Sequence, residues 1–264
     1  MIGYKNIFTL IWFKLTRKNK DNEEFQDLAH HIHLQALETK NIGQGAFIAD
    51  RGESNLFKHI TLSKDPIVFD VGANKGQYSE LLLKSLIPAI IYAFEPVHTV
   101  ADIFETKITS EKVHLIRKGL GETEGSLIIY KDPSNDLLSS VYKRDLSQTN
   151  FDLSSEEEIE ITTLDKFCQL NKIDKIDYLK LDVEGHEMSA LKGSIEMLRA
   201  GRINHIQFEF GGCNLDSRTN LRDFFNLLSN QYKIFRILED GIIEVNYDAS
   251  HEVYNTTNFI AILK

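Results

Sequence analysis

Hydrophobic and polar positions follow two different patterns along this chain, and the pattern changes at Pro66. Before Pro66, apolar residues recur at helical spacing over residues 23–40 and 54–63, which predicts two helices. After it, short apolar runs alternate with segments of helical spacing, as in a parallel sheet covered by helices. We therefore expect a helical extension over residues 1–63 and a doubly wound α/β domain over residues 64–264.

The apolar runs after Pro66 predict the strands of this sheet. In chain order they are residues 67–71, 89–94, 113–117, 176–181, 203–210, 233–238 and 259–263. Helices are expected over residues 78–85, from the second strand to about 108, and over 187–199 and 221–229. Residues 126–130 and 158–162 alternate apolar and polar side chains, which suits an exposed edge or a hairpin. The polar stretch between them, residues 132–157, is expected to form a long loop or lid.

The N-terminal region contains one apolar run, residues 7–13, between Lys5 and Lys14. The run is shorter than the roughly 20 apolar residues that span a bilayer, and no small-residue cleavage site follows it, as a signal peptide would require. We expect no transmembrane segment. The alternatives left open are a helix that packs on the main domain, one that pairs two subunits of a homodimer, and one that makes peripheral contact with a membrane or a partner.

Charge and cysteine content narrow the classes of function. The formal net charge is −9, so the chain has no overall basic field for attracting nucleic acid. Its two cysteines, Cys168 and Cys213, form no CxxC pair, so neither a disulfide framework nor a thiolate zinc site is expected. We therefore expect a cytoplasmic protein without nucleic acid as substrate.

The first candidate for chemistry is the segment DVGANKG at residues 70–76, where a hydrophobic strand gives way to a helix. Ligands of open α/β sheets bind at the carboxyl ends of the strands, so this turn faces the expected crevice. Gly72 and Gly76 allow close backbone approach and positive φ. The spacing is not GxGxxG, because Asn74 stands where the middle glycine would be, which disfavours a dinucleotide. Asp70, inside the strand end, needs a partner such as an ammonium group or a backbone amide.

Two further acidic positions follow other strands. Glu95 comes directly after the second strand, where a carboxylate can accept hydrogen bonds from both hydroxyls of a ribose. Asp182 and Glu184 follow the fourth strand two residues apart, so in extended conformation both would point into the crevice. His186 could act as a general base near neutral pH, and Glu187 would be a first-turn acid that favours the helix dipole.

With these segments in place, the chain resembles the FkbM-type methyltransferases, enzymes that use S-adenosyl-L-methionine and mostly methylate oxygen. Residues 68–79, 94–96 and 178–193 carry the resemblance, which extends over about residues 66–211. It implies a class I methyltransferase (Rossmann-like) fold with a seven-stranded sheet whose last strand is antiparallel. It also implies a small-molecule or glycan acceptor, such as a hydroxyl of a surface polysaccharide sugar or of a secondary metabolite.

The resemblance also implies roles for individual residues. Asp70, Gly72, Asn74 and Gly76, with Tyr78, would surround the methionine part of the cofactor, Glu95 its ribose and Leu120 its adenine. Asp182 would lie beside the methionine part or the methyl group. Glu184, His186 and Glu209 become candidates for binding or deprotonating the acceptor.

Three alternatives stay open from the sequence. A nicotinamide-dependent oxidoreductase would share the strand, the glycine turn and the acid after the second strand. A degenerate relative would keep the fold as a non-catalytic binding subunit. Within the methyltransferase hypothesis, Asp182 and Glu184 could hold Mg²⁺, although no third ligand can be assigned, so we expect no metal.

Overall fold

The computed structural model describes Trp12, Thr16 and residues 21–43, 52–86, 89–132, 135–144 and 152–264. The chain divides into two compact units, Met1–Gly43 and Gln44–Lys264. The second unit begins before the expected boundary at residues 63 and 64, because Leu56 is buried in one of its cores. Apart from Trp12, the apolar run at residues 7–13 lies outside the described residues.

In the first unit, helix α2 (Glu23–Thr39) confirms the helix expected over residues 23–40. Its N-terminus is capped by the Asn22 side chain, which accepts a hydrogen bond from the Phe25 amide at 3.0 Å. The helix expected over residues 54–63 belongs to the second unit and is shorter than expected, since α3 spans only Glu53–Leu56. After it the amides of Lys58 and His59 donate three residues back, so the chain turns instead of continuing as an α-helix. No helix among the described residues is long and apolar enough to cross a membrane.

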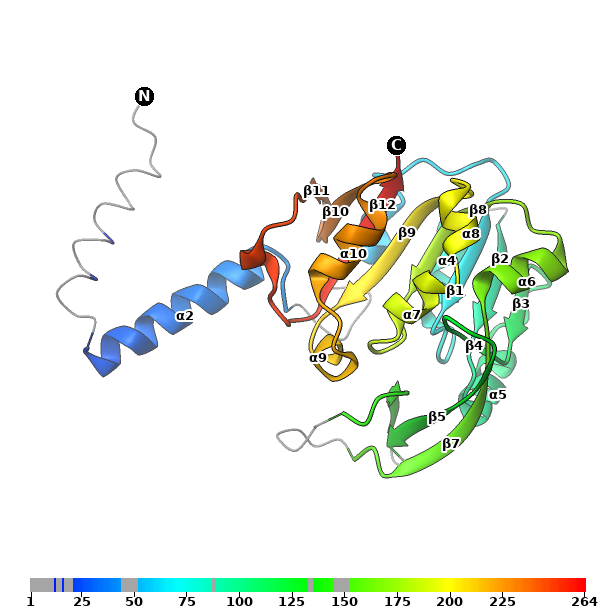
Figure 1. The fold of residues 1–264 in the computed structure, drawn as a ribbon, viewed down its shortest axis with the longest axis horizontal. Coiled ribbons are helices and arrows are strands. Elements are labelled where there is room, and N and C mark those ends of the chain that lie inside the picture. Colours follow the sequence, from blue (N-terminus) through cyan, green and yellow to red (C-terminus); the bar gives the residue numbers. More distant parts are fainter. Residues whose placement is uncertain are drawn as a thin grey trace. The chain divides into compact units, whose positions relative to one another are not determined.

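The main sheet of the second unit has eight strands within the described residues, in the order β11-β10-β12-β9-β8-β1-β2-β3 (Figure 1). Their bounds are β1 (Ile67–Val71), β2 (Ile90–Phe94), β3 (Val113–Ile116), β8 (Ile176–Leu181), β9 (Ile203–Phe210), β10 (Tyr232–Leu238), β11 (Gly241–Glu244) and β12 (Thr257–Leu263). All seven expected strands are present. The eighth, β11, forms an antiparallel hairpin with β10.

Strand directions agree with the expected class. The strands β1, β2, β3, β8 and β9 pair in parallel. β12 is antiparallel to both of its neighbours, β9 and β10. Parallel strands are buried on both faces, which is why their sequences read as nearly continuous apolar runs. The carboxyl ends of β1, β2 and β8 therefore lie side by side at one edge of the sheet.

Helices cover both faces of this sheet. On one face α6 (Leu164–Asn171), α7 (Glu187–Lys192), α8 (Ile195–Arg199) and α10 (Leu221–Leu228) pack over the larger core. On the other, α3, α4 (Gln77–Ser85) and α5 (His98–Lys107) pack over smaller clusters. Two short helices, α9 (Cys213–Ser217) and η2 (Ala249–His251), lie in the connections after β9 and β11.

The single helix expected over residues 187–199 is broken into α7 and α8. A Cβ on Gly193 would lie 1.9 Å from the carbonyl oxygen of Gly121, so the backbone passes too close for any side chain. The Gly193 carbonyl accepts from the Asp165 amide at 3.0 Å. The Asp165 carboxylate in turn accepts from the amides of Glu196 and Met197 at the start of α8. These tertiary contacts fix the break.

A second, four-stranded sheet lies below the main sheet in the view of Figure 1, in the order β4-β7-β5-β6. Its strands are β4 (Gly119–Leu120), β5 (Gly125–Asp132), β6 (Asn135–Ser140) and β7 (Ser155–Thr162). The antiparallel pair β5 and β7 confirms the expected hairpin-like strands. The loop expected over residues 132–157 is partly wrong, because β6 pairs with β5 on both sides of a register shift between Lys131 and Asp132.

Candidate functional site

The glycine turn after β1 joins the ends of three strands. The amides of Gly72 and Ala73 donate to the carbonyl of Phe94 in β2 at 3.1 and 3.0 Å, and the Asp182 amide donates to Val71 at 3.0 Å. Gly72 has a φ of +83°, and a Cβ there would lie 1.8 Å from the Asp182 carbonyl oxygen. Only glycine permits both the backbone conformation and this approach.

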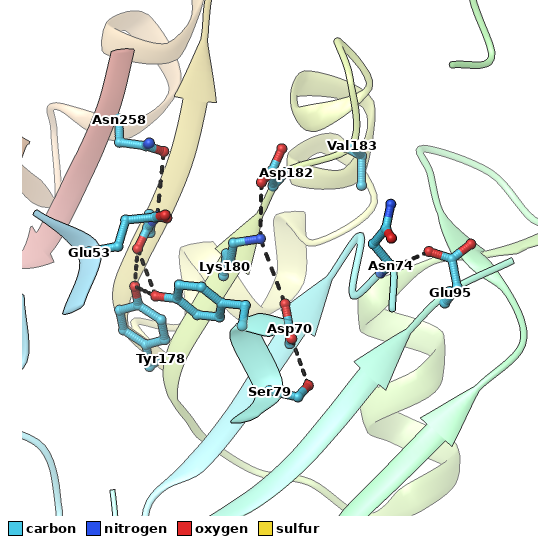
Figure 2. Close-up of polar contacts among 12 residues, drawn as sticks. Glu53, Asp70, Asn74, Ser79, Glu95, Tyr178, Lys180, Asp182, Val183 and Asn258 are labelled. Carbon is cyan, nitrogen blue, oxygen red and sulfur yellow. Dashed lines mark hydrogen bonds and ion pairs between the residues drawn. The ribbon is translucent and has the colours of Figure 1, made fainter. Parts of the chain in front are cut away.

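Glu95 lies beside this turn, as the sequence predicts. One carboxylate oxygen accepts from the Asn74 amide at 3.0 Å (Figure 2), and the other accepts from the Val97 amide at 2.8 Å. Burial raises the pKa of Glu95 to about 7, against the opposing effect of these two amides. Each oxygen keeps a lone pair, so the carboxylate can still accept further hydrogen bonds.

Asp70 and Asp182 are joined by an ammonium group of the chain itself. Lys180 Nζ donates to Asp182 at 3.1 Å and lies 3.7 Å from Asp70, while the Ser79 hydroxyl donates to the other Asp70 oxygen at 2.7 Å (Figure 2). Burial opposes the charge of Lys180, but the two carboxylates outweigh it and raise its pKa. The partner that Asp70 requires is therefore supplied from within the protein.

Tyr78 and Leu120, both expected on the cofactor side, are buried side chains. The Tyr78 hydroxyl lies 2.7 Å from that of Tyr178 and donates to Gln207 at 3.0 Å, and its ring faces Lys180 Nζ at 4.6 Å. Leu120 is 1% exposed and packs in the larger core. The tyrosine hydroxyl thus belongs to a buried network, which Gln207 extends to Glu53 and Asn258.

The segment after β8 is a turn, which corrects the expectation that Asp182 and Glu184 point the same way from an extended strand. β8 ends at Leu181, and Glu184 has a φ of 51°. The Glu184 carboxylate accepts from Arg144 Nη1 at 2.7 Å, and its backbone carbonyl accepts from the Ser140 hydroxyl at 2.8 Å. Arg144 also lies 3.5 Å from Asp216. The turn therefore directs Asp182 toward Lys180 and Glu184 toward Arg144.

Glu209, at the end of β9, lies close to Glu184, the other acid that the resemblance offers for the acceptor. Oxygen atoms of the two carboxylates and the sulfur of Cys213 lie within 4.8 Å of one another. This donor set does not fit Mg²⁺, which takes oxygen ligands. Burial raises the pKa of Cys213, so the sulfur is held as a thiol, and the Arg144 guanidinium already pairs with Glu184. Asp182 is not in this group, so the described residues do not assemble the Asp182 and Glu184 site considered for Mg²⁺.

His186 and Glu187 have environments that the sequence does not reveal. His186 Nδ1 lies 3.0 Å from the Tyr142 hydroxyl, and its Nε2 is buried without a hydrogen-bond partner among the described residues. Burial lowers the pKa of His186 to about 4, so the ring is neutral at pH 7. Glu187 accepts from the amides of Val183 and Gly185, and burial raises its pKa to about 8. It braces the turn from inside the protein as well as standing in the first helical turn.

Sequence reasoning gave no role to Lys180 or Arg144. A lysine inside the otherwise largely apolar run of β8 is the signal that could have marked Lys180, because a buried ammonium needs paired acids. Arg144 offers no comparable signal, since it follows β6 in a polar stretch without periodicity.

Fold and site together define a class of protein. Numbered by the seven expected strands, the sheet reads 3-2-1-4-5-7-6 with the seventh antiparallel, which is the class I methyltransferase fold. The chain belongs to the methyltransferase FkbM domain family, whose domain matches residues 70–234, more than half of the chain.

Individual relatives are more distant. The chain is 26% identical over 160 residues to the hexuronic acid methyltransferase AglP of Haloferax volcanii, covering 57% of this chain and 59% of that protein. It is 25% identical over 158 residues to the 2-O-methyltransferase NoeI of Sinorhizobium fredii, covering 54% and 63%. A solved rRNA methylase from Streptococcus thermophilus aligns with a TM-score of 0.45 and 13% identity, over 80% of this chain and 95% of that one. The chain spans less than two thirds of the length of AglP and NoeI.

Proposed function

We propose that this protein transfers a methyl group from S-adenosyl-L-methionine to a hydroxyl oxygen of a sugar or of a secondary metabolite. The observation that carries the proposal is the meeting of three strand ends: the glycine turn after β1, Glu95 after β2 and Asp182 after β8. Family membership supports the reaction class. The hexuronic acid methyltransferase AglP supports a sugar acceptor, and the 2-O-methyltransferase NoeI supports transfer to oxygen.

The cofactor would lie across these strand ends. The turn from Gly72 to Gly76 and the exposed edge of Asp182 would face its methionine part, and Glu95 would accept hydrogen bonds from the ribose hydroxyls. We place the adenine near Leu120, toward the side of the second sheet. Methyl transfer from a sulfonium is an in-line displacement, so holding the two substrates in register contributes most of the rate acceleration.

The acceptor would lie at the ends of β8 and β9. Glu184 and Glu209 are the carboxylates placed to bind its hydroxyl and to take the proton that the oxygen loses as its bond to the methyl group forms. His186 is less suited to that step, because its pKa is lowered to about 4 and its Nε2 is buried. We assign it a positioning role through Tyr142.

The setting of the reaction follows from charge and thiol chemistry. A net charge of −9 favours a small-molecule or glycan acceptor over nucleic acid. Cys168 and Cys213 are both free and buried, which is consistent with a reducing compartment, and we infer a cytoplasmic location.

Calorimetry with S-adenosylhomocysteine tests the proposal before any acceptor is known. We expect S-adenosylhomocysteine to bind the wild type and to bind Glu95→Ala much more weakly. We expect NADH not to bind the wild type. Binding of NADH would establish the oxidoreductase alternative instead. Absence of binding by either ligand would point to a non-catalytic binding subunit of the same fold.

A further inference from the structure

Two almost fully buried charged side chains, Asp70 and Lys180, form a row with Asp182 in the candidate site. Lys180 is 3% exposed and Asp70 is fully buried, whereas the Asp182 side chain is 30% exposed. The lysine therefore stands between an acid that solvent does not reach and one at the edge of the sheet (Figure 2). A charge is stable at such depth only when paired and hydrogen-bonded.

The two acids of the row have different environments. Asp70 receives the Ser79 hydroxyl on one oxygen and faces the lysine with the other, so its charge is balanced inside the protein. Burial raises the pKa of Asp70 against the opposing effects of Lys180 and Ser79, so the row carries at most a single excess negative charge. That charge can face outward only at Asp182, the exposed member.

Asp182 lies where the amino-acid end of the cofactor is proposed to bind. Its amide donates to Val71, and its carbonyl oxygen touches Gly72 so closely that a Cβ there would come within 1.8 Å. The backbone of the glycine turn and the Asp182 residue are thus held against each other. The Asp182 carboxylate accepts a hydrogen bond from Lys180 at 3.1 Å, which helps to hold its side chain.

We infer that Lys180 is a positioning residue for recognition of the amino-acid end of the cofactor: it balances Asp70 internally and orients Asp182 toward the cofactor ammonium. The inference rests on the proposed function, because it requires a ligand with an amino-acid end at the glycine turn. It separates the two acids, making Asp70 a structural counter-ion and Asp182 the acid that contacts the ligand.

Two ligands that differ only at that end provide the test. S-adenosylhomocysteine carries the amino-acid end, whereas 5′-methylthioadenosine keeps the adenosine and the thioether without it. We expect Lys180→Met to weaken S-adenosylhomocysteine by at least about tenfold, the loss typical of one hydrogen bond to a charged group. Methylthioadenosine affinity should stay within about twofold. A general loss of structure would weaken both ligands alike.

Lys180→Met leaves Asp70 buried without its cation, and loss of one partner of a buried pair is strongly destabilising. The double variant Lys180→Met/Asp70→Asn removes both charges and provides a folded form if the single variant fails to fold. It should show the same selective loss of S-adenosylhomocysteine affinity. Asp182→Asn is the matched variant at the contacting acid and should also be selective, whereas Glu95→Gln should weaken both ligands because both carry the ribose.

The outcomes separate this inference from the function on which it rests. A folded double variant that binds S-adenosylhomocysteine as tightly as the wild type, or more tightly, overturns the role of Lys180, and equal weakening of both ligands does the same. A wild type that binds methylthioadenosine as tightly as S-adenosylhomocysteine overturns only the recognition of the amino-acid end. A wild type that binds neither overturns the proposed function itself.

Discussion

Burial of Glu95 should make the stability of the whole domain depend on pH. The pKa of this carboxyl is raised from 4.5 to about 7, because desolvation outweighs the two amides that it accepts. A raised pKa in the folded state means that the folded protein holds the proton more tightly than the unfolded chain. Stability from this group is therefore fully present below pH 4.5 and is lost as the pH rises to about 7.

The magnitude follows from the size of the shift. One pKa unit corresponds to about 1.4 kcal/mol, so a shift from 4.5 to about 7 corresponds to about 3.4 kcal/mol across the full titration. Of this, about 2.5 kcal/mol falls between pH 5 and pH 8. Urea denaturation of the wild type and of Glu95→Gln at pH 5 and at pH 8 measures this change in stability. The free energy of unfolding of the wild type relative to the variant should fall by about that amount as the pH rises.

Other titrating groups are common to both proteins and cancel in the difference. Glu187→Gln provides a matched control, because burial raises the pKa of Glu187 to about 8. The stability of the wild type relative to this variant should therefore keep falling to higher pH than for Glu95→Gln. A difference that stays constant within about 0.5 kcal/mol between pH 5 and pH 8 would refute the reasoning. It would mean that the backbone amides compensate Glu95 fully for its burial.

Three further predictions test the site and its support. Methylthioadenosine affinity should rise about tenfold from pH 6 to pH 8 as Glu95 ionises, and calorimetry of Glu95→Gln should show no such rise. Gly72→Ala should lower the free energy of unfolding, measured in urea, by at least about 2 kcal/mol, since φ is +83° and the new Cβ would overlap the Asp182 carbonyl after β8. Gly212→Ala is the control and should change the free energy of unfolding little, because its Cβ would come no nearer than 3.8 Å to its neighbours. Gln207→Leu should cost at least about 2 kcal/mol, because it removes the side-chain amide that accepts from both tyrosine hydroxyls and donates to Glu53, and a loss below about 1 kcal/mol would contradict this network.

The strands of the main sheet were predictable because burial on both faces demands continuous apolar runs. The break between α7 and α8 was not, because it depends on the contact of Gly193 with Gly121, far away in the sequence. β6 was missed because its polar sequence carries no alternation, and pairing with β5 determines its conformation. Local pattern thus defines elements that bury a regular face, and tertiary contact defines the others.

The candidate site divides in the same way. The glycine turn and Glu95 follow from position at strand ends, which any open α/β sheet shares. Lys180 could be seen as unusual in its strand, but its partner Asp70 belongs to a strand more than a hundred residues earlier. Asp182 and Glu184 were found correctly as acids after β8, although their directions depend on a left-handed turn that spacing alone does not indicate.

The second sheet begins and ends at one place on the domain, because β4 and β7 are paired neighbours and the Gly121 amide donates to Thr162 at 3.0 Å. Its far end reaches the acceptor side through Ser140, Tyr142 and Arg144. The described part of residues 119–162 therefore leaves and rejoins the domain at one point and brings Ser140, Tyr142 and Arg144 to the proposed acceptor side. A change at Tyr142 or Arg144 would therefore act on the proposed acceptor side while leaving the ends of β1, β2 and β8, where the methyl donor is proposed to bind, intact.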